Sequence, residues 1–378
     1  MRVLHILNEL RPSGFEVMLK VSAPYWQKMD VQAELLATGK DIGQYAQSLE
    51  EVGYKTYHLP FSRSYLRARS FFASLYKFLR SNKYDVVHAH VEGGLFWIIL
   101  TAKLAGVPQV VKTIHNVFPW RGWLGFKRRF QKMILRFMGI PHVSVGPSVR
   151  TTEWEYFRNP TLYIPNWYDS ERFVPLNPES RNEIRERLNI DEDTFTVVSV
   201  GNCSRTKNHT ALLGALANIS DKIKFLYLHV GEEEPGQPER HLAGELGITK
   251  QVHFLGFVED ISPILNAADV YVMPSLHEGF SIAAMEAMGA GVPSILADVP
   301  GLRDFKDIAD GVFWVNPEAA SLSEALITIA SMPKEKRREI GLALHHAVYE
   351  RFSIEQGVGA YASLYVNDDS EVGLEWGY

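Results

Sequence analysis

Short apolar runs alternate with longer amphipathic stretches along nearly the whole chain. The runs are brief and rich in β-branched residues, which is typical of buried parallel strands. In the first half of the chain they cover residues 2–7, 31–38, 54–60, 84–90, 109–116, 142–148 and 161–166. In the second half they cover 194–202, 224–231, 251–258, 270–275, 293–298 and 311–317, with helical patterns at 209–219, 239–248, 262–268, 281–290 and 321–332.

This alternation of strand and helix predicts two doubly wound α/β domains, each built on a parallel sheet. A polar segment that contains Pro165, Pro175 and Pro178 separates the two series. We therefore predict an N-terminal domain, joined by the C-terminal segment, and a second domain; their ranges are 1–168 with 352–378, and 169–351. Ligands of such sheets bind at the carboxyl ends of strands, so two facing domains would share a cleft. The alternative is two domains with independent or purely structural roles.

The composition is that of an ordinary soluble globular protein, because 46% of the 378 residues are hydrophobic and 22% are charged. The single cysteine, Cys203, excludes an internal disulfide framework and fits a reducing compartment. The N-terminus lacks the long apolar core of a signal peptide. No run approaches the roughly 18 apolar residues of a membrane span. We therefore expect a cytoplasmic protein.

The net charge of −5 conceals an asymmetry between the two halves. Residues 1–170 hold 22 Lys and Arg against 12 Asp and Glu, whereas the remainder holds 17 against 32. The first half therefore carries a basic field that suits an anionic partner, such as a membrane surface or a nucleic acid.

The segment HEGFSIAAMEAMGAGVP follows a predicted strand and carries an unusual polar pattern. Ser281 is expected to cap a helix, and Gly279 allows the backbone to approach a ligand closely. N–H groups from Phe280 onward would face a phosphate, while Glu278 would accept hydrogen bonds from hydroxyls. Glu286 lies two turns into the helix among Ala and Met, where a pair of ribose hydroxyls would explain it. The alternatives for Glu286 are an ion pair with Lys or Arg, or a solvent-facing position.

The segment SVGNCSRTKNH follows the first strand of the second series and precedes a helix. Gly201 marks a tight turn, and Arg205 and Lys207 place cations at the carboxyl end of the strand. These cations are candidates for binding a diphosphate, although a solvated surface loop is the alternative. The loop does not match the G-x-x-x-x-G-K-[ST] pattern of a P-loop.

A glycine-containing turn in NELRPSGFEVMLK links the first strand to the first helix. Gly14 would allow close approach of a ligand, as in other turns between a strand and a helix. The segment is not a G-x-G-x-x-G fingerprint, so a nicotinamide cofactor has no support here. An ordinary loop is the alternative.

Three histidines lie at or near the ends of predicted strands, at His88, His90 and His115. His88 and His90 point to one face of a strand, a spacing that also occurs in metal sites. No nearby cysteine or further histidine supplies a third and fourth ligand, so we expect no metal site. His115 is the best candidate for a side chain that reaches into the cleft.

The segment FPWRGWLGFKRRFQKMILRFMG predicts an interfacial amphipathic helix, because aromatic and basic side chains interleave at helical spacing. Aromatic bulk at this spacing suits a lipid surface better than a nucleic acid. The plainer alternative is a core-packing helix with a solvated basic face. The candidate membrane or acceptor contacts are Trp120, Arg121, Trp123, Lys127, Arg128 and Arg129.

Together these segments resemble the retaining GT-B glycosyltransferases of family 4. HEGFSIAAMEAMGAGVPSI is similar to the E-x7-E signature of that family, with Glu278 and Glu286 as its two glutamates. VVSVGNCSRTKNH is similar to its donor-phosphate loop, and YIPNWYDSERF to its interdomain segment. VHFLGFVEDISPILNAADVYVMPS follows the family pattern, and DVVHAH and VVKTIHN match its N-terminal strands. The resemblance spans nearly the whole chain and implies two Rossmann-like domains that face a central cleft.

The resemblance implies a role for each matched residue. Glu278 would bind hydroxyls of the donor sugar, Glu286 the ribose, and Lys207 the diphosphate. His115 would contact the sugar or help to position the acceptor, so His115, Lys207 and Glu278 are the expected catalytic residues. The family needs no metal or other cofactor. Further donor contacts would come from Gly14, Phe15, Asn202, Arg205, Gly256, Phe257, Val258, Gly279, Phe280 and Ser281.

Three positions depart from the family pattern. Asn202 stands where an arginine often follows the glycine, Phe15 where a second glycine is common, and Trp167 where the motif usually reads PNG. The expected reaction is retaining transfer from a nucleotide diphosphate donor, with UDP favoured and GDP second. The expected acceptor is a lipid-linked glycan of cell-surface polysaccharide synthesis, at the cytoplasmic membrane face. The alternatives are a non-catalytic nucleotide-sugar-binding protein and a nucleotide-sugar 2-epimerase. A nucleic-acid partner is not expected.

Overall fold

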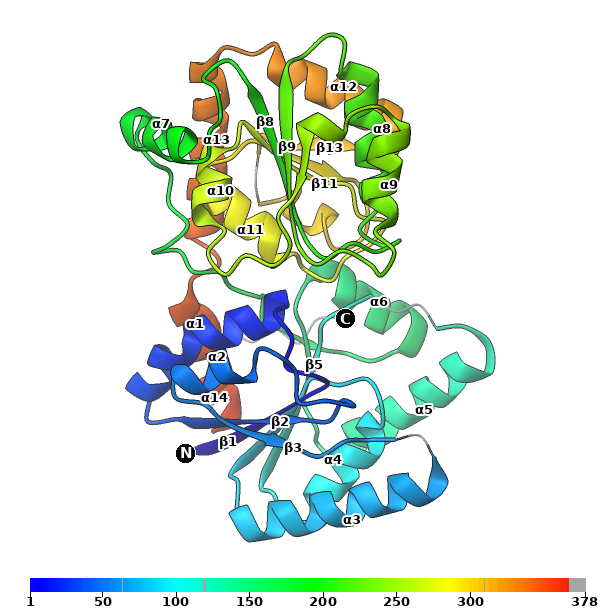
Figure 1. The fold of residues 1–378 in the computed structure, drawn as a ribbon. Helices are drawn as coiled ribbons and strands as arrows, with labels where there is room; N and C mark the ends of the chain where they lie inside the picture. The colour runs from blue at the N-terminus through cyan, green and yellow to red at the C-terminus, as the bar shows by residue number, and fades with distance from the viewer. Residues whose placement is uncertain (63, 118–119, 309, 367–378) are drawn as a thin grey trace. The chain divides into compact units, whose positions relative to one another are not determined.

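The computed structural model describes residues 1–62, 64–117, 120–308 and 310–366. The chain forms two compact units. The N-terminal unit comprises residues 1–167 together with the segment that begins at Ile354, and the C-terminal unit comprises residues 168–353. Each unit contains one parallel sheet accompanied by helices (Figure 1), which confirms the predicted pair of doubly wound α/β domains.

The sheet of the N-terminal unit has seven strands in the order β3-β2-β1-β4-β5-β6-β7. The order reverses between β1 and β4, which marks the topological switch point where such sheets bind ligands. The strands are β1 (Arg2–Leu7), β2 (Gln32–Ala37), β3 (Lys55–His58), β4 (Val86–Ala89), β5 (Gln109–Ile114), β6 (His142–Ser144) and β7 (Leu162–Tyr163). The helices are α1 (Gly14–Lys28), α2 (Ala46–Glu51), α3 (Tyr65–Asn82), α4 (Leu95–Leu104), α5 (Gly122–Phe137), α6 (Pro147–Phe157) and α14 (Ile354–Tyr365).

The sheet of the C-terminal unit has six strands in the order β10-β9-β8-β11-β12-β13, and its switch point lies between β8 and β11. The strands are β8 (Phe195–Val200), β9 (Phe225–Val230), β10 (Val252–Phe254), β11 (Val270–Met273), β12 (Ser294–Ala297) and β13 (Phe313–Val315). The α-helices are α7 (Pro178–Arg187), α8 (His209–Ile219), α9 (Pro238–Glu245), α10 (Ser262–Ala267), α11 (Ile282–Gly289), α12 (Ala319–Ala330) and α13 (Lys334–Tyr349). Short 3₁₀ turns occur at η1 (Thr249–Gln251) and η2 (Arg303–Phe305).

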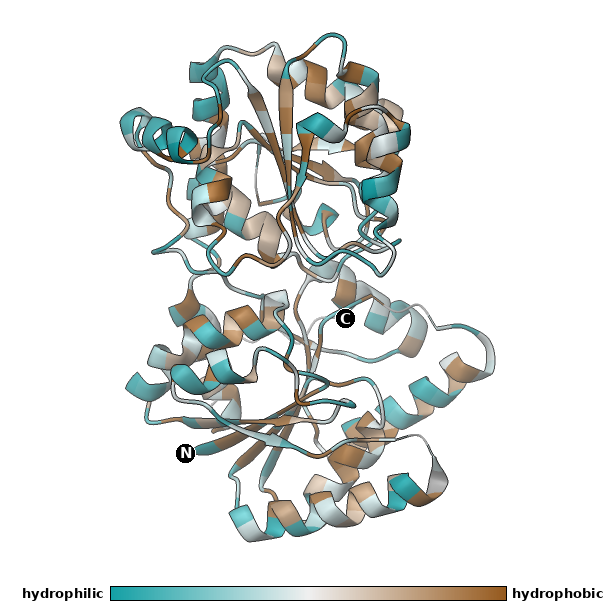
Figure 2. Cartoon of the chain, in the orientation of Figure 1, coloured by the Kyte–Doolittle hydropathy of each residue, from teal (hydrophilic) through white to brown (hydrophobic). Residues whose placement is uncertain are grey.

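Burial explains why the strands read as continuous apolar runs. Every residue of β4, β11 and β12 is buried, as expected for parallel strands that are covered on both faces. Figure 2 shows hydrophobic residues concentrated in the two sheets, whereas α7 is mainly hydrophilic. Helix α7 refines one sequence expectation, because the polar segment that separates the two series ends at Pro178. Pro178 opens a helix that Asn177 caps by accepting a hydrogen bond from the Ser180 N–H at 2.8 Å.

Helix α14 joins the N-terminal unit through close packing and through side-chain hydrogen bonds. Gly357 lies so close to the buried indole of Trp167 that an added Cβ would be 1.9 Å from a ring carbon. Its tyrosines reach the sheet, because the Tyr361 hydroxyl lies 3.0 Å from the Thr113 hydroxyl and the Tyr365 hydroxyl lies 2.7 Å from His88 Nδ1. Helix α14 therefore packs against β4 and β5.

We expect Gly357→Ala to destabilise the N-terminal unit by about 1–3 kcal/mol, because the added methyl group overpacks the contact with Trp167. Gly359→Ala is the matched control on the same helix, since a Cβ there meets no atom within 4 Å. The control should be neutral or slightly stabilising, because alanine favours helix over glycine. Urea unfolding of both variants tests this, and equal midpoints for the two would contradict the packing account.

Candidate active site

Two loops of the C-terminal unit meet at the carboxyl edge of its sheet, one after β8 and one after β11. The Leu276 N–H donates to the Thr206 carbonyl at 2.8 Å. The side-chain amide of Asn208 donates to the carbonyls of Pro274 and Pro317, at 3.0 and 2.9 Å. These bonds fix the two loops against each other beside the switch point, so the segments singled out in the sequence form one site.

Lys207 and Glu278 form an ion pair at this place, with 2.8 Å between Nζ and Oε1. The lysine reaches the glutamate by crossing Gly201, where an added Cβ would lie 3.1 Å from the lysine Cε. Gly201 also has a φ of +145°, which favours glycine. Both side chains are partly exposed. The residues predicted to bind a diphosphate and a sugar therefore pair with each other.

The segment Gly279-Phe280-Ser281 leads directly into α11. The Ser281 hydroxyl accepts a hydrogen bond from the Ala284 N–H at 3.2 Å, so the predicted N-cap is confirmed. The Phe280 ring is buried against Phe305 and Phe352, with centroids 4.7 and 5.2 Å apart. This packing anchors the loop. Because the ring is buried, only the backbone of Phe280 can contact a ligand.

Glu286 is buried in the middle of α11. Within the described chain no side chain donates a hydrogen bond to its carboxyl group and none forms an ion pair with it. Burial raises the pKa of this carboxyl to about 8, while Arg172 lowers it and Asp169 raises it further. Neither alternative from the sequence applies, because Glu286 is neither ion-paired nor exposed. A carboxyl group in this state is ready to accept hydrogen bonds from a ligand.

The other residues of the C-terminal unit that the sequence suggested as contacts of the sugar donor differ in their bonding and exposure. Asn202 Oδ1 accepts from the Glu232 N–H at 2.9 Å, so this side chain braces the loop. Arg205 is exposed, with no hydrogen bond or ion pair to the described residues. Gly256 accepts at its carbonyl from the Gly231 N–H at 2.9 Å. The neighbouring Phe257 is exposed and Val258 is half-buried.

Cys203, His209 and His229 form a buried cluster beside the loop that follows β8. Cys203 Sγ lies 3.4 Å from His229 Nε2, and His209 packs edge-on against His229. Burial raises the pKa of the Cys203 thiol to about 12 and lowers that of His229 to about 4. The ligand atoms of these three residues lie within 4.8 Å of one another. Cys203 and His229 lie within hydrogen-bond distance of each other and His209 packs on His229, which suits a role in supporting the loop.

The remaining candidates lie in the N-terminal unit. Gly14 and Phe15 open α1, and the Phe15 ring packs on His90 and His115, with centroids 4.3 and 4.4 Å apart. His115 is half-buried at the end of β5. Glu16 is buried and accepts a hydrogen bond from the Ser13 hydroxyl, and burial raises its pKa to about 7. Phe15 therefore covers the rings of His90 and His115.

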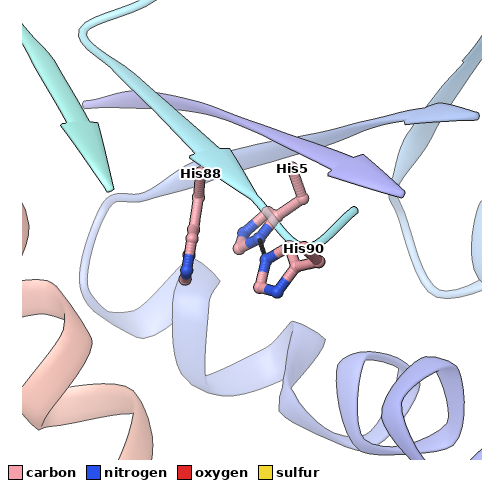
Figure 3. A group of neighbouring side chains, drawn as sticks. All are labelled: His5, His88 and His90. Carbon is pink, nitrogen blue, oxygen red and sulfur yellow. Dashed lines mark hydrogen bonds between the residues drawn. The ribbon is translucent and has the colours of Figure 1, made fainter. Parts of the chain in front are cut away.

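The histidine group is larger than the sequence suggested. His5 of β1 lies beside His88 and His90 (Figure 3), and its Nδ1 is 3.0 Å from His90 Nε2. The expectation that no further histidine lies near His88 and His90 is therefore wrong. The reason is strand order, because β1 and β4 are neighbours whose register pairs His5 with His88.

Helix α5 carries the predicted aromatic and basic face. Several large apolar side chains are exposed on it and before it: Trp120 41%, Trp123 79%, Phe126 62%, Phe130 51% and Phe137 85%. Arg121, Lys127 and Arg129 are exposed beside them, whereas Arg128 is half-buried and lies 3.8 Å from Glu92. Lys132 does not belong to this face, because it is buried and paired with Glu153. Phe118 and Pro119 lie outside the described residues.

Comparison with known families decides what kind of protein carries this site. Residues 3–201 match the model of Glycosyltransferase Family 4, and residues 180–343 match that of Glycosyl transferases group 1. The chain belongs to glycosyltransferase family 4. It is a transferase enzyme, and the resemblance found in the sequence is confirmed.

Curated relatives of this glycosyltransferase agree with that assignment. EpsF of Bacillus subtilis, which is named as a glycosyltransferase, is 26% identical over 376 residues and covers 96% of each chain. The UDP-Gal:alpha-D-GlcNAc-diphosphoundecaprenol alpha-1,3-galactosyltransferase of Escherichia coli is 28% identical over 243 residues, which is 60% of this chain and 61% of that protein.

Solved structures show the same GT-B fold. HepE of Anabaena, solved in complex with UDP and glucose, has a TM-score of 0.81 and 18% identity and covers 96% of this chain and 99% of its own. A glycosyltransferase from Rickettsia africae has a TM-score of 0.81 and 17% identity over 98% and 99% of the two chains. Across the described residues, no helix is both long and apolar enough to span a membrane.

The raised pKa of Glu286 gives a test of its environment. A carboxyl whose pKa is about 8 when folded and 4.5 in its ordinary state costs stability as pH rises from about 5 to 8, because only the folded chain keeps the proton. We expect Glu286→Gln to match the wild type near pH 5 and to exceed it increasingly toward pH 8, by up to about 1.4 kcal/mol per pH unit. Melting temperatures across this range measure the difference. A difference that does not vary with pH would contradict the assignment.

Proposed function

We propose that this glycosyltransferase transfers a sugar, with retention of anomeric configuration, from a UDP-sugar to a lipid-linked glycan acceptor. The observation that carries the proposal is the ion pair of Lys207 and Glu278 at the carboxyl edge of β8 and β11. A cation for a diphosphate and a carboxylate for sugar hydroxyls lie side by side there. The bound UDP and glucose of the HepE structure, and the UDP-Gal in the name of the Escherichia coli relative, support the choice of donor.

Donor binding would exchange partners within this pair. The diphosphate takes the Lys207 ammonium, joined by Arg205 and by N–H groups at the start of α11, where the helix dipole favours an anion. Glu278 is then released to accept hydrogen bonds from sugar hydroxyls. Glu286 accepts from the ribose hydroxyls and becomes ionised as it gains those donors. Asn202 keeps its bond to the Glu232 N–H and holds the loop in shape.

The proposed transfer needs no enzyme nucleophile. The bond between C1 of the sugar and the phosphate oxygen breaks, and the acceptor oxygen forms a new bond to C1 on the same face. The acceptor hydroxyl gives its proton to the leaving diphosphate. Lys207 and Arg205 stabilise the charge that develops on the leaving group, which is the kind of electrostatic effect that often contributes most to catalysis. No metal or other cofactor takes part.

The acceptor side rests on the exposed face of α5. Trp123 and Phe126 stack on each other with centroids 5.7 Å apart, both largely exposed, beside Lys127 and Arg129. Aromatic side chains flanked by cations suit the interface of an anionic membrane. This surface would hold the enzyme on a membrane, where a lipid-linked acceptor is found.

The ion pair yields a sharp prediction for Glu278→Gln. The change removes the internal partner of Lys207, so UDP should raise the melting temperature at least as much as in the wild type. Turnover should fall about 100-fold or more, as for loss of a group that stabilises the transition state. Lys207→Met should lose both UDP binding and turnover. Thermal shift and UDP-release assays over a panel of UDP-sugars measure both effects.

Glu234→Gln provides the control, because Glu234 is an exposed carboxylate of the same unit. It should leave binding and turnover unchanged. Undiminished turnover in Glu278→Gln would refute the site. A panel in which no nucleotide sugar stabilises the wild type would refute a nucleotide-sugar function, since saturation at a hundredfold excess over Kd adds about 2.7 kcal/mol.

Membrane attachment is tested by a double variant, Trp123→Ser with Phe126→Ser. Wild type should sediment at low salt with vesicles of phosphatidylglycerol and phosphatidylcholine, and the variant should stay in the supernatant. Tyr349→Ser is the control, because Tyr349 is an exposed aromatic of the C-terminal unit. Wild type that remains unbound, or a double variant that still binds, would contradict the role of α5.

A further inference from the structure

Three imidazoles form a continuous hydrogen-bonded chain in the N-terminal unit. His5 Nδ1 lies 3.0 Å from His90 Nε2, and His90 Nδ1 lies 2.9 Å from His115 Nε2. Figure 3 shows the inner part of the chain, where His5 of β1 points at His90 beyond the end of β4. The chain runs from the core to the carboxyl edge of the sheet, where His115 is half-buried.

All three imidazoles are neutral at ordinary pH. Burial lowers the pKa of His5 to about 3 and that of His115 to about 4, although Glu92 raises the latter. Burial, together with the neighbouring histidines, lowers the pKa of His90 well below its ordinary value. A neutral imidazole has one N–H and one lone pair. Each of the two bonds in the chain therefore needs a donor on one ring and an acceptor on the other.

Only two proton arrangements satisfy both bonds. In the first, each ring carries its proton on Nδ1, so that His5 donates to His90 and His90 donates to His115. The outer atom, His115 Nδ1, is then an N–H donor, and His5 Nε2 is a bare lone pair. In the second, every proton is on Nε2, which leaves His115 Nδ1 as an acceptor and His5 Nε2 as an N–H.

The inner end of the chain favours the first arrangement. His5 Nε2 is buried without a hydrogen-bond partner in the part of the chain that the structure describes. A buried N–H without an acceptor is rarer in proteins than an unsatisfied acceptor, so a proton at that end is disfavoured.

We propose that His90 and His5 are positioning residues that hold His115 in the tautomer with its proton on Nδ1. His115 then presents a neutral hydrogen-bond donor, and not a base, to an oxygen of the substrate. This use of the donor rests on the proposed transferase function. Phe15 fixes the two outer rings by packing on both of them.

His88 offers a matched control within the same cluster. Its ring lies 4.0 Å from that of His90, measured between centroids, and it belongs to β4, which ends at Ala89 just before His90. Its two nitrogens bond elsewhere, however, to the hydroxyls of Tyr365 and Thr113, each at 2.7 Å. It therefore lies outside the chain of three rings.

The first experiment reads the tautomers directly by NMR of the full chain labelled with ¹⁵N in its histidines. Two-bond proton–nitrogen correlations should show His5, His90 and His115 protonated on Nδ1. A proton on Nε2 of His115 would overturn the proposal. This measurement needs no substrate, so its result stands apart from the success or failure of the proposed reaction.

The second experiment compares His90→Phe with His88→Phe. His90→Phe should leave His115 as a mixture of tautomers and lower kcat/KM by about tenfold, the factor expected for one hydrogen bond. His88→Phe should keep the Nδ1 tautomer of His115, even if the variant is less stable. A retained tautomer in His90→Phe would overturn the proposal.

A zinc titration tests whether the cluster binds a metal instead, since nitrogens of His5, His88 and His90 lie within 4.8 Å of one another. The proposal predicts that zinc leaves the spectra of His5, His90 and His115 unchanged, because the nitrogens that join these rings already bond to one another and both nitrogens of His88 bond to hydroxyls. Stoichiometric binding of zinc with loss of those ring signals would show a metal site in place of the hydrogen-bonded chain.

Discussion

A parallel sheet brings the carboxyl ends of all its strands to one edge, and the chemistry of both units depends on that constraint. The switch points differ only in which strands meet, β1 with β4 in one unit and β8 with β11 in the other. Loops that are far apart in sequence must converge there. Lys207 and Glu278, 71 positions apart, reach a distance of 2.8 Å for this reason.

The polar groups at the carboxyl edges of the two sheets are stabilised in different ways. In the C-terminal unit opposite charges face each other in the pair of Lys207 and Glu278, and burial raises the pKa of Glu286 so that this carboxyl keeps its proton near neutral pH. In the N-terminal unit the polar groups are neutral rings that bond to one another. The first arrangement leaves charged groups ready to exchange partners with an anionic ligand, while the second fixes donors and acceptors in place.

Much of the fold was predictable because buried parallel strands have a plain apolar signature. The Ser281 cap and the convergence of the two donor loops followed from residue type and position. Other features depended on three-dimensional neighbours. His5 went unnoticed because its partners lie 83 and 85 positions away, and only the pairing of β1 with β4 brings them together. The ring of Phe280 and the side chain of Asn202 likewise support the loops, which the sequence alone did not distinguish from ligand contacts.

The most direct test of the central claim is the configuration of the sugar that this enzyme releases. Many transferases slowly hydrolyse their donor when no acceptor is present, and proton NMR identifies the first anomer before it equilibrates. The full chain would be incubated in turn with UDP-α-glucose, UDP-α-galactose and UDP-α-N-acetylglucosamine. The account predicts that the α anomer appears first with one of these donors. First appearance of the β anomer, or no release from any of the three, would contradict it.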